Sequence, residues 1–425
     1  MISKMIRFEI DIWQEILYTV RQNRLRSLLT AFGVFWGLFM LVIMIGTGHG
    51  LQKGAYSEFS GYATNSVFIW PRLTTKPYKG FPIGRRFKFT NEDTEVIRRM
   101  VPGVSSLAPR GRKRGGDGSN NVTHGDRTAT LTIYGDHPEV QNIRLLQMIS
   151  GRFLNRLDLA ERRKVAVIGE ETIKLLFEKE ESPIGTYISI NNINFKVIGV
   201  YRLPSRNDED YEEEAKAVFL PLSTFQRVFN WGDVVGWFSI TSQPQVKASV
   251  VRDEVIRVLA GRHAVAPEDE RAFGSWNMED EFQKIADLFV GIRFIVWFVG
   301  IFTLIAGIIG VSNIMLIAVK ERTREIGIKR TVGATPFSVI SQVLMEALLL
   351  TSIPGYLSLV CGVAVLEGVG RLIHILKIDA QMFQDPSIDF AAALLALAVL
   401  TIAGTLAGLI PAYRAVQDKP VEALR

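Results

Sequence analysis

The most restrictive feature of this sequence is a long apolar run that turns abruptly ionic. The run closes with Asn313–Val319, and the residues from there to Arg330 include seven charged side chains, five of them positive. Hydrocarbon does not accommodate so many charges, so the run must leave a membrane at this point. Gly333 and Pro336 then indicate a helix stop before the next apolar run. We expect a short amphipathic helix on the membrane surface, on the cytoplasmic side where Lys/Arg-rich loops are typical.

Four apolar stretches, including this run, are long enough to cross a hydrocarbon core of roughly 30 Å. The second stretch continues a helical apolar pattern that begins at about Glu279. A single helix from there to Val319 would be about twice as long as the core is thick, so about half of it is expected to stand outside the membrane as a stalk. The predicted spans are residues 28–50, 286–319, 338–366 and 391–413.

Basic residues orient these spans. Arg21, Arg24 and Arg26 precede the first span, and the ionic segment follows the second. The loop between the third and fourth spans lacks this inside signature, so both ends of the chain are expected in the cytoplasm. Outside the spans we predict a cytoplasmic amphipathic helix (1–27), an extracytoplasmic domain (51–285), a cytoplasmic ionic segment (320–337), an outer loop (367–390) and a cytoplasmic tail (414–425).

The extracytoplasmic domain is predicted to be α/β with a β-rich insertion. Val67–Trp70 has the pattern of a strand, Thr90 that of a helix cap, and Asn191-Asn192 that of a hairpin turn. The Gly-rich, basic stretch Arg110–Gly125 is predicted as a solvated loop and the acidic run Asp208–Glu214 as a solvated connector. The order of elements places the insertion at 109–215, between α/β flanks at 51–108 and 216–285.

Composition and motifs argue against several classes of protein. At 48% hydrophobic residues and a mean hydropathy of +0.18, the chain is expected to be part membrane and part soluble. The net charge of +6 forms no single basic stripe, so no nucleic-acid partner is expected. The one cysteine, Cys361, and five histidines show no metal-ligand spacing. Neither GxxxxGK[ST] nor HExxH occurs, so we expect no catalytic residue, metal or cofactor in this chain.

Two motifs carry a family resemblance. The run Glu321–Ile328, reading ERTREIGI and followed by a basic pair and Gly333-Ala334, resembles the coupling segment of macrolide-exporter-type ABC permeases, the MacB-like or FtsX-like (type VII) family. Gly408–Ala415 and Pro420–Arg425 are similar to the family's ending, and the outer domain resembles its porter-like domain with an insertion. The resemblance implies an ATPase-coupling site formed by Glu321, Arg322, Thr323, Arg324, Glu325, Ile326, Gly327 and Gly333.

The resemblance also implies a function and partners. The chain would be a permease subunit of the bacterial inner membrane, and a separate ABC subunit would bind the ATP. The permease would form a homodimer or a heterodimer among the membrane lipids. Closure of the ATPase would move the coupling segment, and the long helices would carry that motion to the outer domain. The expected result is efflux of a substrate such as a drug, toxin or peptide from the periplasm. A periplasmic adaptor and an outer-membrane channel are further candidate partners.

Three alternatives to an efflux permease differ in what they require of the sequence. A lipoprotein-releasing permease resembles this layout as closely as an efflux permease does. A transmembrane sensor or regulator of cell-envelope enzymes would need a cytoplasmic output domain, yet no predicted cytoplasmic segment exceeds about 30 residues. A membrane hydrolase would need a nucleophile and a base, and the sequence offers no such pair.

Few polar residues lie within the predicted spans, so we expect the spans to transmit force rather than to conduct cargo. Arg293 can extend from the outer end of the second span to the headgroups. Glu346, about two turns into the third span, could face Lys320 or a partner protein. Candidate helix-packing positions share the GxxxG spacing, which also arises by chance, and are Gly33, Gly37, Gly404 and Gly408.

Overall fold

The chain divides into two compact units in the computed structural model, unit 1 (Met1–Gly54 and Asp287–Arg425) and unit 2 (Ala55–Ala286). Most of the predicted N-terminal helix (1–27) and of the tail (414–425), with its Pro420–Arg425 motif, lies outside the residues that the structure describes. The described residues are 24–59, 61–114, 120–178, 181–204, 211–376, 383, 386 and 390–417.

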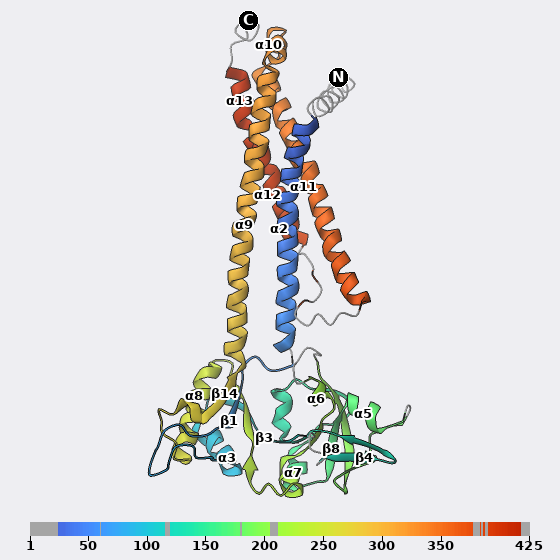
Figure 1. Ribbon diagram of the computed structural model, residues 1–425, viewed down its shortest axis with the longest axis vertical. Helices are drawn as coiled ribbons and strands as arrows, with labels where there is room; N and C mark the ends of the chain where they lie inside the picture. The colour runs from blue at the N-terminus through green and yellow to red at the C-terminus, as the bar shows by residue number, and fades with distance from the viewer. Residues whose placement is uncertain are drawn as a thin grey trace. The chain divides into compact units, whose positions relative to one another are not determined.

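Unit 1 consists of helices, the longest of which run side by side (Figure 1). Their facing sides share one apolar core, to which Leu38, Met315, Ala347 and Leu400 contribute. The helices are α2 (Arg24–Phe59), α9 (Met278–Glu321), α10 (Thr323–Thr331), α11 (Pro336–Ile375), α12 (Phe390–Ala407) and α13 (Leu409–Gln417).

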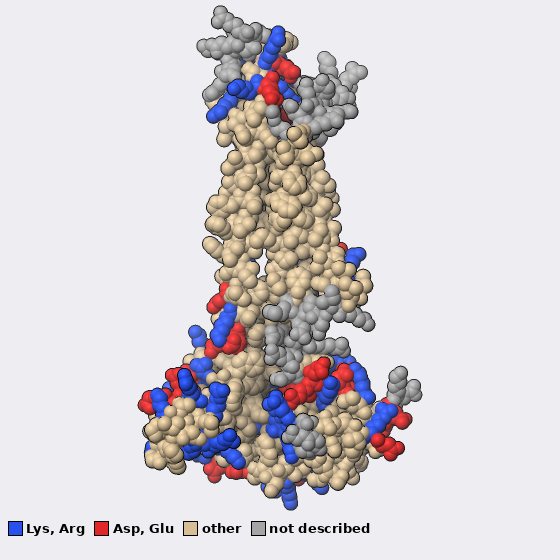
Figure 2. Space-filling model, viewed as in Figure 1, with Lys and Arg blue, Asp and Glu red and all other residues tan. Residues whose placement is uncertain are grey.

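Four helical stretches among the described residues are long and apolar enough to cross a membrane, and each coincides with a predicted span. The first three are longer than predicted, and α11 continues into the predicted outer loop (367–390) as far as Ile375. In the view of Figure 2, the described part of the helical unit has an uncharged middle zone, as a lipid-facing surface requires. The stretches are Leu28–Ser57, Met278–Glu321, Pro336–Ile373 and Ala393–Arg414.

The second and fourth spans differ in continuity. α9 is a single helix of 44 residues, about 66 Å long at 1.5 Å per residue, which confirms the predicted long helix. The fourth span is interrupted at Gly408, whose N–H bonds to the carbonyl of Thr405 at 3.0 Å. Pro411 explains the interruption, because it has no N–H to donate to the carbonyl of Ala407. A proline also lies inside α11, at Pro354, but α11 is assigned as one helix throughout.

Unit 2 is built on one twelve-stranded mixed sheet with the order β14-β1-β13-β3-β6-β11-β8-β10-β9-β4-β5, in which β7 also pairs with β10. A separate two-stranded sheet joins β2 (Phe89–Thr90) to β12 (Val234–Val235). The strands of the large sheet are β1 (Ser66–Pro71), β3 (Val104–Lys113), β4 (Asn121–His124), β5 (Arg127–Thr130), β6 (Ile133–Asp136), β7 (Gln147–Gly151), β8 (Val165–Gly169), β9 (Tyr187–Ile190), β10 (Ile193–Arg202), β11 (Val218–Pro221), β13 (Trp237–Ser242) and β14 (Phe273–Asn277).

Each face of the large sheet carries an apolar core. Successive residues of a strand point to opposite faces, so Val67 and Ile69 of β1 enter one core and Phe68 enters the other. The helices of unit 2 are α3 (Asn91–Met100), α4 (Arg156–Ala160), α5 (Glu170–Leu176), α6 (Tyr211–Ala215), α7 (Leu222–Val228) and α8 (Ala248–Arg262), with 3₁₀ turns at Pro138–Asn142 and Glu270–Ala272.

Several local predictions for unit 2 are confirmed. Thr90 precedes α3, and its N–H donates to the Asp93 carboxylate at 2.8 Å as in a capping box. β9 and β10 form the predicted hairpin through Asn191 and Asn192. Both asparagines have positive φ, 48° and 65°, as a type I′ turn requires.

The prediction of a loop at Arg110–Gly125 is wrong at both ends. Arg110–Lys113 belongs to β3 and Asn121–His124 to β4, and residues 115–119 lie outside the described part of the chain. Glycine is required inside this strand because a Cβ on Gly111 would lie 2.9 Å from the ring of Phe225. The glycine therefore makes room for an aromatic side chain instead of marking a turn.

The predicted boundary of the insertion (109–215) also needs correction. β11, assigned by sequence to the flank 216–285, lies between β6 and β8 of the insertion. β3 starts in one predicted piece and ends in the other. A single sheet therefore runs through insertion and flanks, because non-local strand pairing joins segments that the chain order separates. In the acidic run, Glu214 is buried rather than solvated, and its carboxylate pairs with Arg144 at 2.7 Å.

Candidate functional site

The coupling segment begins where α9 gives way to α10. Arg322 forms the turn between the two helices, with φ −103° and ψ 9°. The hydroxyl of Thr323, the first residue of α10, donates back to the carbonyl of Lys320 at 2.9 Å. The N–H of Ile326 donates to the carbonyl of Arg322 at 3.0 Å, so α10 follows α9 without an intervening loop.

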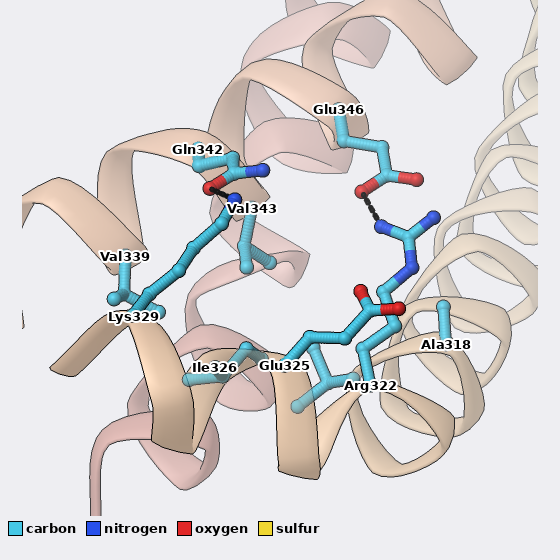
Figure 3. Close-up of a pocket in the computed structure, with 10 residues that line it drawn as sticks. Ala318, Arg322, Glu325, Ile326, Lys329, Val339, Gln342, Val343 and Glu346 are labelled. Atoms are coloured by element: carbon cyan, nitrogen blue, oxygen red, sulfur yellow. Dashed lines mark hydrogen bonds and ion pairs between the residues drawn. The ribbon is translucent and has the colours of Figure 1, made fainter. Parts of the chain in front are cut away.

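Two polar contacts join the coupling segment to α11 (Figure 3). Arg322 Nη1 lies 3.4 Å from Oε2 of Glu346, which is 6% exposed. Lys329 Nζ lies 3.5 Å from Oε1 of Gln342. The cavity between these side chains is about 30 Å³, room for a few water molecules at most. The site is therefore a contact between helices and not a ligand pocket. Glu346, for which the sequence left Lys320 and a partner protein open, pairs with Arg322 of the same chain.

The end of α10 is fixed by backbone hydrogen bonds. The N–H of Ala334 donates to the carbonyl of Lys329 at 3.0 Å, and the N–H of Gly333 to that of Arg330 at 3.2 Å. This is a Schellman motif, and Gly333 takes the left-handed conformation it needs, with φ 111°. Pro336 then occupies the first position of α11. The predicted helix stop at Gly333 and Pro336 is confirmed.

The coupling segment is also attached to the last helix. Arg330 Nη1 donates to the backbone carbonyl of Val416 in α13 at 2.7 Å. An arginine near the C-terminus of a helix satisfies one of the carbonyls that have no partner within the helix. α10 is thus held by α11 on one side and by α13 on the other. The partner of Arg330 could not be predicted from the sequence, because a backbone carbonyl has no sequence signature.

Some of the remaining residues of the segment are buried, and others are exposed to solvent. Gly327 is buried, and Ile326 is half-buried against the apolar core of unit 1. Ile328 is 46% exposed, so apolar residues of α10 do not share one face, and the predicted amphipathic helix is not observed. Exposed residues on and beside α10 form what we call the coupling surface: Glu321, Arg324, Glu325, Ile328, Val332 and Phe337.

The candidate packing glycines fall into two groups. A Cβ on Gly404 of α12 would collide with Thr351 of α11, and one on Gly408 would lie 2.8 Å from the Cβ of Ala347. Gly37 of α2 allows a close approach to α9, since its Cβ would lie 3.4 Å from the carbonyl oxygen of Thr303. A Cβ on Gly33 would meet nothing within 4 Å in this chain. The structure therefore places three of the four glycines at helix contacts.

Two family models match this chain, one in each half of the sequence. The model described as the MacB-like periplasmic core domain matches residues 27–258, which is more than half of the chain. The model described as the FtsX-like permease C-terminal domain matches residues 297–420, which include the coupling segment, α11, α12 and α13.

Curated relatives match almost the whole chain. The macrolide export ATP-binding/permease protein MacB of Bdellovibrio bacteriovorus is 27% identical over 411 residues, which cover 96% of this chain and 60% of the relative. The pyoverdine export ATP-binding/permease protein PvdT of Pseudomonas putida is 27% identical over 403 residues, covering 95% of this chain and 57% of the relative. The chain thus spans about 60% of the length of the relatives that it matches.

Two solved structures resemble part of the chain. The periplasmic region of MacB from Actinobacillus actinomycetemcomitans aligns with a TM-score of 0.43 at 19% identity, covering 54% of this chain and 95% of that one. The extracellular domain of the noncanonic ABC-type transporter YknZ from Gram-positive bacteria aligns with a TM-score of 0.41 at 16% identity, covering 50% of this chain and 100% of that one.

Proposed function

Because this chain belongs to the MacB-like, FtsX-like family of ABC transporter permeases, we propose that it transmits ATP-driven motion from a separate ATPase to its outer domain and so drives export. The observation that carries this proposal is the continuity of α9, which ends directly at the coupling segment. A helix without a break transmits displacement along its axis, whereas a flexible loop would absorb it. ATP would be bound by the partner subunit, which docks on the coupling surface.

The first turn of α9 is anchored inside unit 2, as a force-transmitting helix requires. Asn277 Oδ1 accepts the N–H of Glu279 at 3.1 Å, and the Glu279 carboxylate accepts the N–H of Ala248 at the start of α8 at 2.6 Å. Arg252 of α8 pairs with Asp280 at 3.2 Å. Movement of α9 would therefore be passed to α8 and to β14, the strand that leads into α9.

The coupling surface has the chemistry of a docking site for another protein. Val332 is 85% exposed and Phe337 is 78% exposed, and both flank the rigid turn at Gly333. Glu321, Arg324 and Glu325 are also exposed and add charges of both signs. Exposed apolar side chains together with charged ones are the usual composition of a protein interface.

The spans themselves offer little to a polar cargo. Hydroxyl groups within them bond to their own helix: Thr47 to Ile43, Thr303 to Gly300, Thr351 to Ala347, Ser358 to Gly355 and Thr405 to Thr401, at 2.6–3.0 Å. A hydroxyl bonded in this way does not need a second polar group or a water file. We propose that cargo moves outside the bundle, on the extracytoplasmic side, in response to motion of the outer domain.

The names of the relatives, which concern macrolide and pyoverdine export, favour export over lipoprotein release. We place the chain in the bacterial inner membrane with both ends in the cytoplasm, as a homodimer or heterodimer of permeases. A periplasmic adaptor and an outer-membrane channel would complete the route if cargo leaves the cell directly.

Docking is tested with a double variant of the coupling segment, Glu325→Lys with Gly327→Leu. The first change reverses a charge on the coupling surface and the second introduces a side chain at a buried position, so we expect the ATPase to be lost during purification. Neither position lies in the uncharged part of a span, so the yield of membrane-inserted permease should remain near wild type. Copurification of the ATPase at wild-type yield would refute the docking assignment.

A matched control keeps the charge reversal but moves it away from the coupling segment. Glu367 lies near the other end of α11, where it is exposed and pairs with Arg371 at 3.3 Å. The control variant is Glu367→Lys. This variant should retain the ATPase. Loss of the ATPase in both variants would point to a general effect of charge reversal on the permease.

Orientation is tested by labelling single cysteines in a Cys361→Ser background. Asp126 lies in the exposed turn between β4 and β5, and Asp126→Cys should react with an impermeant thiol reagent from outside the inner membrane. Thr323→Cys should react only after the membrane is opened. The reverse pattern would overturn the topology, and the docking proposal would fall with it.

A further inference from the structure

One face of the large sheet in unit 2 carries an aromatic pocket of about 470 Å³ that neither the sequence motifs nor the coupling site explains. Three of the seven tryptophans of the chain line it. Arg110, Arg112 and Glu214 supply its charged groups. Its aromatic side chains are Tyr62, Phe68, Trp70, Tyr134, Trp237 and Trp276.

Strand register brings these side chains together. Phe68 of β1 lies opposite Trp276 of β14, with ring centroids 5.6 Å apart. On the other side of β1 follow β13, β3 and β6. Trp237 of β13 lies opposite Arg110 of β3, and Arg112 of β3 lies opposite Tyr134 of β6. The pocket therefore extends over five adjacent strands, β14-β1-β13-β3-β6, on one face of the sheet.

Several of the aromatic side chains that line the pocket are closely packed against their neighbours. Trp70 lies opposite Gly274 in the neighbouring strand, and its indole occupies the space where a Cβ on Gly274 would be. Phe68 and Tyr62 are less than 10% exposed and meet edge to face at 5.5 Å. Trp70 and Trp276, in contrast, are 37% and 38% exposed, so large apolar surfaces remain uncovered at the pocket.

One of the charged side chains of the pocket, Arg112, has no carboxylate partner among the described residues. Arg110 is paired with Asp136 at 2.6 Å, and Glu214 with Arg144 at 2.7 Å, so these four charges balance. Arg112 lies 5.9 Å from the centroid of the Trp237 ring. Among the residues that the structure describes, no carboxylate forms an ion pair with Arg112. A positively charged group beside aromatic faces suits an anion whose apolar part can stack.

We infer that this pocket binds a small amphipathic anion, with an aromatic or cyclic body against the tryptophans and a carboxylate, sulfonate or phosphate at Arg112. The volume lies in the range of about 300–1,000 Å³ that is typical of sites for small organic ligands. An anionic group is favoured over a cationic one because both carboxylates are already paired with arginines. Binding of this anion does not depend on the proposed export function. Only the further assumption that the bound anion is exported as cargo rests on that function.

Binding is tested with the full chain in phosphatidylcholine nanodiscs, without an ATPase. The probe is 8-anilinonaphthalene-1-sulfonate, and the comparison dye is N-phenyl-1-naphthylamine, which has the same ring systems without the sulfonate. Signals from empty nanodiscs are subtracted, and binding is followed by quenching of the emission of the seven tryptophans, three of which line the pocket. We expect saturable binding of the sulfonate dye to the wild-type chain.

Variants assign the binding to this pocket. Arg112→Gln should weaken the sulfonate dye about tenfold and leave the neutral dye within about twofold, whereas Arg112→Lys should retain most of the affinity. Trp276→Ala should weaken both dyes. Arg99→Gln, which removes an exposed arginine from α3, is the matched control and should change neither affinity.

Two results would overturn the inference. One is the absence of saturable binding by the wild-type chain, in which case the side chains of a partner protein would be the better occupant of the pocket. The other is equal affinity of the sulfonate dye for the wild type, Arg112→Gln and Trp276→Ala. Since no nucleotide or transport enters the measurement, neither result bears on the proposed coupling function.

Discussion

Each unit of this protein contains a buried arginine–carboxylate pair, and the two pairs differ in geometry. In unit 2, Arg110 contacts Asp136 through two parallel hydrogen bonds of 2.6 and 3.0 Å, and both side chains are almost fully buried. In unit 1, Arg322 contacts Glu346 at a single distance of 3.4 Å, and 23% of the arginine side chain is exposed. The first pair is bidentate and buried on both sides, whereas the second is a single long contact with a partly exposed arginine.

The difference fits the roles that we propose for the two regions. Arg110 lies between the rings of Tyr134 and Trp237, at 5.1–5.2 Å from their centroids, and helps to shape the pocket. Burial raises the pKa of Asp136 to about 6 although Arg110 acts against it, which shows how thoroughly this carboxylate is removed from water. The Arg322–Glu346 contact joins α11 to a segment that is proposed to move. A contact that must break and reform is better served by a weak pair than by a bidentate one.

The largest effect is expected for Arg110→Met, which retains apolar volume and removes the charge. It leaves the Asp136 carboxylate buried without its partner, so we expect unit 2 to lose about 3–5 kcal/mol of its free energy of unfolding. Chemical denaturation followed by tryptophan emission measures this loss. Arg156→Met is the control, since Arg156 is 85% exposed in its pair with Glu139 and should cost less than about 1 kcal/mol. Equal costs would remove the distinction between buried and exposed pairs in this unit.

The next effect concerns the packing of unit 1. Gly404→Leu places a side chain where Thr351 already lies, so we expect a loss of about 1–3 kcal/mol and a lower thermal midpoint in nanodiscs. Gly33→Leu is the matched control, because a Cβ there meets nothing within 4 Å of this chain. A loss of self-association in the control, without a change in midpoint, would assign Gly33 to a contact with a second copy. An unchanged midpoint for Gly404→Leu would mean that the close contact between α11 and α12 at Gly404 contributes little to the stability of unit 1.

A third effect depends on pH and lies in unit 2. Burial acts against ionisation of Asp93, but hydrogen bonds from His263, Arg262 and Thr90 prevail and lower its pKa to about 2. Because the folded pKa lies below the unfolded value, the carboxylate stabilises the fold above about pH 4, and this contribution is lost as the pH falls toward 2. Asp93→Asn should therefore be less stable than wild type at pH 6, and the difference should shrink in acid.

Paired denaturation curves at pH 6 and pH 3 measure this effect of Asp93. Glu95→Gln, on the exposed side of the same helix, serves as the control and should show little difference at either pH. A constant difference between wild type and Asp93→Asn across this range would show that the carboxylate is not the source of the stabilisation.

The smallest effect on stability is expected for Arg322→Met, the counterpart of Arg110→Met. Because the pair is long and the cavity that both side chains line has room for water beside the buried Glu346 carboxylate, we expect a change within about 1 kcal/mol, measured as the thermal midpoint of unit 1 in nanodiscs. ATP-driven transport by the assembled complex should nevertheless fall, since the contact between the coupling segment and α11 is removed. A cost as large as that of Arg110→Met would show that the two pairs are alike and that the coupling segment is rigid.

Residue patterns were sufficient for most features that depend on neighbours in the chain, although the loop at Arg110–Gly125 and the amphipathic character of α10 were predicted wrongly. The four spans, the long helix α9, the cap at Thr90, the hairpin at Asn191-Asn192 and the stop at Gly333 follow from local hydrophobicity, capping and φ preferences. Glu346 was recognised as unusual because a carboxylate in an apolar run is costly. Its partner was not predicted, because nothing in the spacing of Lys320 and Arg322 shows which of them reaches it.

Longer-range features were decided by tertiary structure alone. Gly111 belongs to a Gly-rich, basic stretch that is typical of a loop, yet it lies in β3. Glycine is required there because the ring of Phe225 fills the space that a Cβ would occupy. The aromatic pocket joins residues as distant in the chain as Tyr62 and Trp276, and only the register of five strands brings them to one face. The sequence by itself therefore determined the spans, the caps and the family, because these depend on local chemistry. Strand order, ion-pair partners and the pocket depend on non-local contacts, which the chain specifies only when it is folded.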